Sequence, residues 1–314
     1  MNSDDVAISV VGLTKKFGSQ TIWEDVTFDV PKGQISVILG PSGTGKSVLL
    51  KHFVGLLKPT RGHVYVDGKD IPTLKEKELF EVRKKFGVLF QDGALFGSMT
   101  IEDNVAFPLR EHTDLSEGTI RGLVSEKLEI VGLSGAEKKF PAEISGGMKK
   151  RAGLARALVL EPEILLFDEP DSGLDPVRTA FLNLLTVDLK KRLGPTIIIV
   201  THHIDTARTI PDYIGLIFAR HLVGFDTREN MLNSKERVIQ QFLTGSVDGP
   251  IGMSEEKDAG DAAGAALLAS RDSGGDETQV IARKPARKPA RKPVHKPARK
   301  PARKRSRPKA KARR

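Results

Sequence analysis

The sequence lacks several features that would place it in other classes of protein. It contains no cysteine, which excludes a disulfide framework and a thiolate metal site. No apolar run reaches the roughly 18 residues that a membrane-spanning helix needs. The first residues, Met1 to Asp5, are acidic and show no signal-peptide pattern. These absences favour a cytoplasmic protein that meets a membrane only through another chain or through a surface contact.

Acidic residues are absent from the C-terminal segment 283–314, which carries 17 of the 50 Lys and Arg residues of the chain. The rest of the chain keeps 33 basic residues against 40 acidic ones, a formal charge of −7. The net charge of +10 therefore hides an acidic body and a basic tail, which need separate explanations.

The basic tail is a four-residue repeat. Ala-Arg-Lys-Pro occurs at 282–285 and returns at 286–289, 290–293 and 298–301. Proline at every fourth position excludes a regular helix or a central strand, and the like charges repel, so we expect a disordered arm over 283–314. Over 248–282 we expect a post-core segment and a flexible linker, because 254–280 is mostly Ala, Gly, Ser, Asp and Glu.

The body, residues 6–247, alternates apolar strand patterns with helical patterns. Buried strands are expected at 35–39, 86–90, 164–168, 196–200 and 214–218, and helices at 76–85, 177–191 and 234–243. This order predicts an α/β fold with a mainly parallel core sheet. Short alternating strands over 6–35 and 63–68 predict an added β subdomain, and the region of about 95–160 predicts a helical subdomain.

A phosphate-binding loop follows the first buried strand. Eight residues match the pattern G-x-x-x-x-G-K-[ST]: Gly40, Pro41, Ser42, Gly43, Thr44, Gly45, Lys46 and Ser47. The glycines let backbone N–H groups turn inward, and the following helix start favours an anion. We expect Lys46 to reach the β- and γ-phosphates of a nucleotide and Ser47 to hold Mg²⁺.

Two acidic residues, Asp168 and Glu169, end the buried strand that lies 121 residues after Ser47. Beside a phosphate loop, Asp168 is suited to bind Mg²⁺ directly or through water. Glu169 is suited to polarise a water for attack on the γ-phosphate.

A second glycine-rich helix start, Ser145-Gly146-Gly147, offers further backbone donors to phosphate oxygens, although this triplet alone is common in loops.

Together these motifs resemble the ATP-binding subunits of ABC transporters over residues 6–247. Gly40–Ser47 resembles Walker A, Ile164–Asp168 with Glu169 resembles Walker B and the catalytic glutamate, and Ile144–Met148 resembles the signature. Gln91 matches the Q-loop glutamine, Ser172–Asp175 the D-loop and His202 the switch histidine. Phe17 sits where the family places an aromatic residue against adenine. From the residues alone, Phe17 could also be a core aromatic and Gln91 a polar strand end.

The resemblance implies an ATPase in which two copies of the chain pack head to tail. ATP would be bound by Walker A of one copy and by Ser145, Gly146 and Gly147 of the other. Glu169 would orient the attacking water and His202 would contact the γ-phosphate. Gln91 would sense the Mg²⁺ or the water and connect the site to membrane permease subunits, so the protein would lie on the inner face of the cell membrane.

Two short patches resemble a subgroup, the Mce and Mla lipid-transport ATPases, including the Mkl-like group of mycobacteria. Met148 replaces the usual Gln of the signature, and 241–245 followed by 248–251 resembles the F-L-x-G and D-G-P segments after the core. This similarity implies lipid or sterol transport with Mce-type substrate-binding proteins. It also implies that residues 241–252 help to hold the dimer together.

Other interpretations remain open from the sequence. The chain could serve a transporter for another substrate, such as a polar amino acid importer or a lipoprotein-release system. The basic tail could bind nucleic acid by counterion release, but it has no aromatic residue for base stacking. Contact between the tail and anionic lipid headgroups, or a merely solvated tail, are the two further possibilities.

Overall fold

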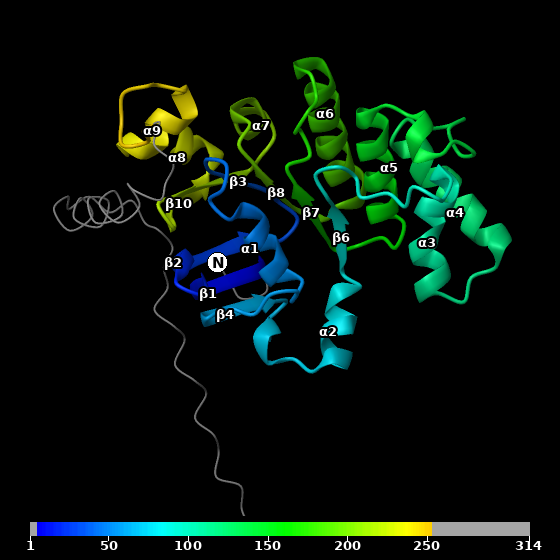
Figure 1. Ribbon diagram of the computed structural model, residues 1–314, viewed down its shortest axis with the longest axis horizontal. Helices are drawn as coiled ribbons and strands as arrows, with labels where there is room; N and C mark the ends of the chain where they lie inside the picture. The colour runs from blue at the N-terminus through cyan, green and yellow to red at the C-terminus, as the bar shows by residue number, and fades with distance from the viewer. Residues whose placement is uncertain (1–4, 253–314) are drawn as a thin grey trace, which may run out of the picture. The chain divides into compact units, whose positions relative to one another are not determined.

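The computed structural model describes residues 5–252, which form two β-sheets with helices packed around them (Figure 1). All described residues belong to one compact unit. The linker and basic tail expected from residue 253 onward lie outside the described residues. Within residues 5–252, no helix combines the length and the apolar character needed to cross a membrane.

The larger sheet contains six strands in the order β10-β9-β3-β8-β7-β6. They are β3 (Ile35–Leu39), β6 (Phe86–Leu89), β7 (Ile164–Asp168), β8 (Thr196–Thr201), β9 (Tyr213–Phe218) and β10 (His221–Thr227). All neighbours are parallel except β9 and β10, which form an antiparallel hairpin. The predicted mainly parallel core sheet is therefore confirmed.

Both faces of the larger sheet are buried, which explains why its strands read as continuous apolar runs. In β8, Ile197 and Ile199 pack into a core shared with the later helices. The alternate residues Ile198 and Val200 pack into a second core on the opposite face, together with residues of the smaller sheet. The strands that carry the site are thus held from two sides.

The smaller sheet is antiparallel, with strand order β2-β1-β4-β5. Its strands are β1 (Val6–Phe17), β2 (Gln20–Pro31), β4 (Arg61–Val66) and β5 (Lys69–Asp70). Asp67 and Gly68 join β4 to β5 with φ values of +46° and +73°, as expected for the Asp-Gly hairpin turn. The predicted antiparallel addition is therefore present.

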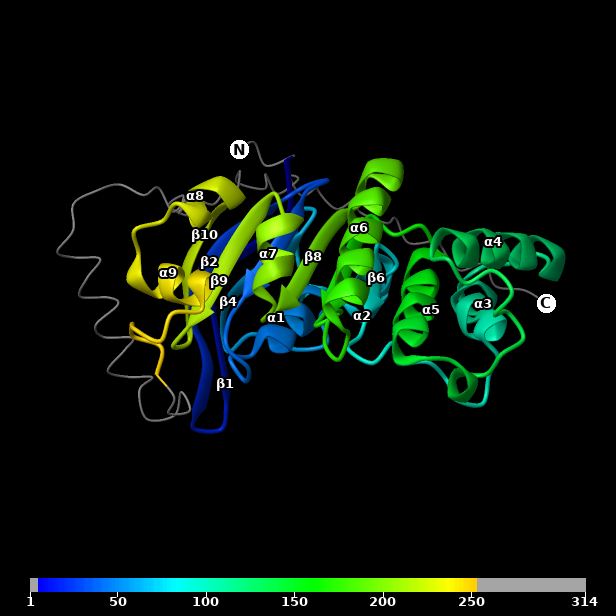
Figure 2. The same ribbon diagram turned by 90° about the horizontal axis from the view of Figure 1, so that it is seen from above.

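Nine α-helices lie among the described residues: α1 (Lys46–Phe53), α2 (Glu76–Arg83), α3 (Ile101–His112), α4 (Glu117–Ile130), α5 (Gly146–Leu158), α6 (Pro176–Leu193), α7 (Ile204–Thr209), α8 (Arg228–Leu232) and α9 (Arg237–Thr244). Helices α3 to α5 gather at one end of this unit, beyond α6 (Figure 2). Side chains of Thr100, Ser116, Ser145 and Asp175 accept a backbone N–H at the starts of α3 to α6 and so fix where these helices begin. The boundaries of a separate helical subdomain stay a prediction.

The sequence did not predict the edge strand β10. Its hairpin with β9 turns at Ala219 and Arg220, whose φ values are +46° and +70°. A turn with two positive φ values normally carries Asn, Asp or Gly, and neither residue belongs to that group. The turn is instead fixed by tertiary contact, because the Glu24 backbone N–H donates to the Arg220 carbonyl over 3.0 Å.

One buried histidine makes the stability of this fold depend on pH. His52 in α1 is 1% exposed; its Nδ1 lies 2.7 Å from the Val48 carbonyl oxygen, and its Nε2 has no hydrogen-bond partner. Burial lowers the pKa of His52 to about 4, although the Val48 hydrogen bond acts in the opposite direction. The folded protein therefore holds this ring neutral at a pH where the unfolded chain protonates it.

We expect the free energy of unfolding to fall as the pH drops from about 6.5 to about 4, by up to ~3 kcal/mol from His52 alone. The sign follows because only the unfolded state gains a proton in that interval. His52→Gln removes this titration, so urea unfolding should show a flatter pH profile for this variant. The exposed His112→Gln serves as the control and should keep the parent slope. Parallel profiles for parent and His52→Gln would contradict the assignment.

Candidate functional site: a nucleotide and magnesium site at the sheet edge

The loop between β3 and α1 has the conformation that its glycines predict. Gly43 and Gly45 adopt φ values of +82° and +86°. A Cβ on Gly45 would lie only 2.3 Å from Ile22 Cγ2, whereas a Cβ on Gly43 would meet nothing within 4 Å. No side chain caps the first turn of α1, so its backbone N–H groups face the loop as donors for an anion.

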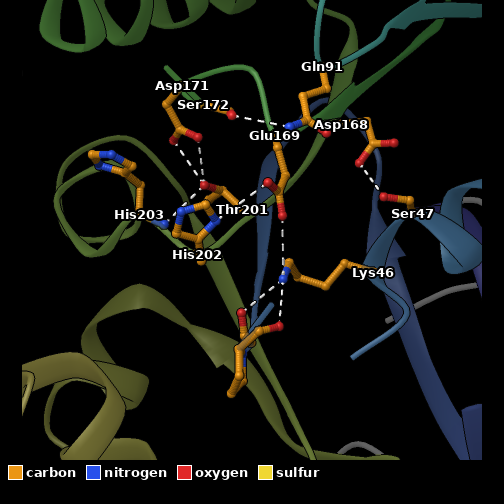
Figure 3. Close-up of polar contacts among 12 residues, drawn as sticks. Lys46, Ser47, Gln91, Asp168, Glu169, Asp171, Ser172, Thr201, His202 and His203 are labelled. Atoms are coloured by element: carbon orange, nitrogen blue, oxygen red, sulfur yellow. Dashed lines mark hydrogen bonds and ion pairs between the residues drawn. The ribbon is translucent and has the colours of Figure 1, made fainter. Parts of the chain in front are cut away.

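Lys46, the first residue of α1, places its ammonium group at the mouth of this loop (Figure 3). Nζ donates to the carbonyl oxygens of Gly40 and Pro41 over 2.9 and 2.8 Å. The same nitrogen lies 3.5 Å from Glu169 Oε1. A positive charge and convergent N–H donors are what a polyphosphate requires, so the loop fits the triphosphate of ATP.

Ser47 and Asp168 meet across the gap between α1 and the end of β7. Ser47 Oγ donates to Asp168 Oδ1 over 2.6 Å. Burial raises the pKa of the Asp168 carboxyl; the charge of Glu169 adds to the rise, and the Ser47 hydrogen bond opposes it. A cation beside these oxygens would relieve the cost of burying the carboxylate.

These two oxygens fit Mg²⁺ as expected from the sequence. Mg²⁺ prefers hard oxygen ligands and usually keeps only one or two from the protein, the rest coming from phosphate and water. Within residues 5–252, no group of three or more His, Asp and Glu side chains could hold a metal ion by itself.

Glu169 lies between Lys46 and His202 (Figure 3). Its Oε1 is 3.5 Å from Lys46 Nζ, and its Oε2 is 3.5 Å from His202 Nδ1. The residue has a φ of +46°, and its backbone N–H donates to the Val200 carbonyl over 2.9 Å. Non-glycine residues in this conformation concentrate at functional sites, and here the neighbouring strand β8 holds it. The structure thus brings Lys46, Glu169 and His202 together.

Gln91 directly follows strand β6, and its side chain contacts the D-loop. Its Nε2 donates to Ser172 Oγ over 3.2 Å, which joins the Q-loop to the D-loop. Its role toward Mg²⁺ stays a prediction.

Phe17 ends β1 and is 46% exposed, with Lys15 Nζ 4.7 Å from its ring centroid. This exposure excludes the alternative of a core aromatic and leaves the ring available for stacking.

The second glycine-rich helix start, Ser145-Gly146-Gly147, is well formed but lies away from the phosphate loop. Ser145 caps α5 by accepting the Met148 backbone N–H over 3.3 Å, and Gly146 and Gly147 open the helix. In both views α6 lies between α1 and α5 (Figures 1 and 2). One chain therefore does not bring Ser145–Gly147 to its own phosphate loop.

The structure adds α5 residues that the sequence analysis missed. Lys150 is 5% exposed. Its Nζ donates to the Pro170 carbonyl oxygen over 2.8 Å and also to the Ser172 carbonyl oxygen. Burial lowers the pKa of Lys150, and the charges of nearby carboxylates oppose this effect. Arg156 donates to the carbonyl oxygens of Gly93 and Ala94 over 2.9 and 2.8 Å. Helix α5 thus holds both the D-loop and the Q-loop, which its basic composition alone did not reveal.

Helix α9 and the residues that follow it, up to Gly252, lie beside the phosphate loop. Gln241 in α9 exchanges two hydrogen bonds of 2.8 Å with the backbone of Ile251. A groove of about 640 Å³ is lined by Pro41, Ser42 and His202 together with seven residues of 241–252: Gln241, Phe242, Gly245, Ser246, Val247, Ile251 and Gly252. This contact places the patch noted in the sequence beside the site, while its expected role in a dimer stays a prediction.

Comparison with known proteins gives a consistent result. The family described as ABC transporter matches residues 23–172. A Mycobacterium leprae protein named probable ribonucleotide transport ATP-binding protein mkl is 64% identical over 253 residues, which cover 81% of this chain and 73% of the relative. The intermembrane phospholipid transport system ATP-binding protein MlaF of Haemophilus influenzae is 45% identical over 244 residues, which cover 78% and 92%.

A solved structure agrees with these sequence relatives. It is a dimeric ATP-binding cassette in a post-hydrolysis state with bound ADP and Pi. Its TM-score to this chain is 0.65 at 30% sequence identity, and the match covers 70% of this chain and 98% of that one.

The loop geometry predicts different costs for two glycine substitutions. Gly43→Ala should lose about 1–2 kcal/mol of stability, since only backbone strain at positive φ opposes it. Gly45→Ala adds the overlap with Ile22 and should lose a further ~1–3 kcal/mol. Urea unfolding of the two variants side by side measures the difference. Equal losses would show that the contact between Gly45 and Ile22 does not constrain the loop.

Proposed function

The chain belongs to the ABC transporter family of ATP-binding subunits, and from that premise we propose that it energises lipid transport through a membrane permease by hydrolysing ATP at sites shared with a second copy of itself. The observation that carries this proposal is the convergence of Lys46, the Ser47–Asp168 pair, Glu169 and His202 at one edge of the larger sheet. Members of this family are ATPases, so the reaction is hydrolysis of the β–γ phosphoanhydride bond.

The residues divide the work of hydrolysis. Backbone N–H groups of Gly40–Ser47 and the Lys46 ammonium would hold the β- and γ-phosphates, with Phe17 stacked on the adenine. Ser47 Oγ and Asp168 would hold Mg²⁺, which neutralises charge on the phosphates when it is bound. Glu169 would orient the attacking water and accept its proton. His202, whose Nδ1 lies 3.5 Å from Glu169 Oε2, would contact the γ-phosphate.

The site would be completed by the second copy. Ser145, Gly146 and Gly147 start α5 with backbone donors that lie away from the phosphate loop of their own chain. In a head-to-tail pair these donors would cover the phosphates bound by the partner. The dimeric relative with ADP and Pi supports this arrangement.

Coupling to the membrane would run through the Q-loop. Gln91 contacts Ser172, and Arg156 of α5 holds the loop at Gly93 and Ala94. Any movement of α5 on ATP binding would therefore displace this loop. We propose that it contacts permease subunits, that Mce-type substrate-binding proteins complete the system, and that the protein lies on the inner face of the cell membrane.

The substrate class is proposed from two observations. The chain spans 92% of the phospholipid transport relative, and Met148 and residues 241–251 carry the patches that resemble lipid-transport ATPases. A second candidate, ribonucleotide transport, is favoured by the name of the 64% identical relative. Since no part of the site recognises a transported molecule, a purified transporter must decide between them.

Glu169→Gln should trap the ATP-bound dimer, because the amide keeps the shape of the carboxylate but cannot accept the proton. We expect hydrolysis to fall by about a hundredfold or more. The complex purified with ATP should contain permease and Mce-type proteins, and extraction should yield lipids. Recovered ribonucleotides without lipid would favour the second candidate. Hydrolysis at the parent rate would show that Glu169 is not the base.

The basic tail is proposed to bind anionic lipid headgroups. Residues 283–314, which lie outside the described residues, contain 17 Lys and Arg residues and no acidic residue. Each basic residue near an anionic surface contributes on the order of 1 kcal/mol. Deletion of 283–314 should therefore abolish binding to anionic vesicles at low salt, measured by cosedimentation, while uncharged vesicles serve as the control. Unchanged binding by the deletion variant would contradict this role.

A further inference from the structure

An apolar pocket lies between α5 and α6, away from the residues of the proposed reaction. The two helices lie side by side in both views (Figures 1 and 2). The pocket has a volume of about 440 Å³. Sites for small molecules usually measure about 300–1,000 Å³, so this space is large enough to hold a ligand.

Apolar side chains form most of the pocket wall. Helix α6 contributes Phe181, Leu182 and Leu185, which share one face of the helix because they are three and four residues apart. Met148 of α5 and Ile130 at the end of α4 also line the pocket. Leu182 is 6% exposed and belongs to the core, whereas Phe181 is 68% exposed. The apolar wall therefore runs from the core to the surface, as an alkyl chain would require.

The charged side chains of the pocket are all positive. Lys150, Arg151 and Arg178 line it, and none of the lining residues within 5–252 is acidic. Lys150 already donates to the carbonyl oxygens of Pro170 and Ser172, which leaves the two arginines for a ligand. Apolar walls with two guanidinium groups favour a molecule that has an apolar chain and an anionic head.

The two arginines are held to different degrees. Arg151 Nη1 donates to the carbonyl oxygens of Val131 and Gly132 over 2.9 and 2.8 Å, which fixes the guanidinium group at the pocket wall. Burial lowers the pKa of Arg151, so a carboxylate beside it would offset the cost of its charge. Arg178 Nε lies 3.2 Å from Asp175 Oδ2, but the Arg178 side chain is 63% exposed. Such an exposed ion pair is weak, so Arg178 can turn to a ligand.

The pocket reaches the glycine-rich start of α5. Ser145 and Gly147 belong to its lining. A Cβ on Gly147 would lie 3.6 Å from Leu174 Cδ2 and 3.8 Å from Arg178 Cδ, so the beginning of α6 lies directly against the start of α5. A ligand between the two helices would therefore contact the same segment that the proposed dimer places on the partner's phosphates.

We propose that this pocket binds a long-chain carboxylate, the chemical class of a free fatty acid, and that the bound molecule slows ATP hydrolysis. The alkyl chain lies between Met148 and Leu185, and the carboxylate binds Arg151 and Arg178. The bound molecule keeps the start of α5 from closing onto the partner's ATP. This inhibition rests on the proposed function, whereas binding rests only on the pocket.

The binding test uses laurate below its critical micelle concentration, added to the full chain without nucleotide and followed by titration calorimetry. Physiological salt weakens any contact between laurate and the basic segment 283–314. Dodecyltrimethylammonium has the same chain length but a positive head, so it should bind about tenfold more weakly or not at all. No binding of laurate, or equal binding of the two amphiphiles, would overturn the proposal.

Two positions on α6 give a matched pair of variants. Phe181→Asp places a negative charge at the pocket and should weaken laurate binding by about tenfold or more. Leu184→Asp is similarly exposed, at 67%, but Leu184 is not among the lining residues, so this variant should keep the parent affinity. Arg178→Gln should weaken binding by about twofold to fivefold. All three variants keep the basic segment, so equal laurate affinities in folded Phe181→Asp and Leu184→Asp would contradict binding in the pocket.

The activity test compares the rates of ATP hydrolysis with and without saturating laurate. The parent rate should fall by about fivefold or more, and the same laurate concentration should leave the rate of Phe181→Asp nearly unchanged. Equal inhibition of both proteins would show that laurate does not act through this pocket. An inactive parent would remove the proposed function, while the laurate affinities would still decide whether the pocket binds a carboxylate.

Discussion

The register of three parallel strands determines almost everything else at this site. Leu39 of β3 pairs with Thr201 of β8, and Asp168 of β7 pairs with Val200. The carboxyl ends of these strands therefore stop at the same level of the sheet. The phosphate loop, the acidic pair and the switch histidine follow these ends directly. A slip of one residue would turn each strand's side chains to the opposite face and separate the groups.

This arrangement gives one subunit two functional ends. At the sheet edge, Lys46, Glu169 and His202 converge beside the phosphate loop, where the proposed hydrolysis would take place. Beyond α6, the start of α5 presents donors that its own loop cannot use. The buried Lys150 of α5 donates to the carbonyl oxygens of Pro170 and Ser172, which follow the acidic end of β7. Helix α5 is therefore tied directly to the loop that follows the acidic pair.

The parts of the fold that could be predicted from sequence are those fixed by local chemistry. Continuous apolar runs identified the buried strands, and the spacing of Gly40 to Ser47 required one particular turn. What could not be predicted depends on tertiary contact: the Ala219–Arg220 turn, the direction of Gln91 toward Ser172, and the buried charges Lys150 and Asp171. A lysine in a basic helix start gives no sign that it will be buried, because only its carbonyl partners in a distant loop make burial possible.

Completion of the phosphate loop by the signature of a second copy can be tested directly, because the chain contains no cysteine. One chain would carry Ser42→Cys and a second would carry Gly146→Cys, both exposed positions, mixed with ATP and a short bifunctional thiol reagent. We expect a covalent dimer only when both variants and ATP are present. Absence of that product, with both variants folded and binding ATP, would contradict a site shared between two copies.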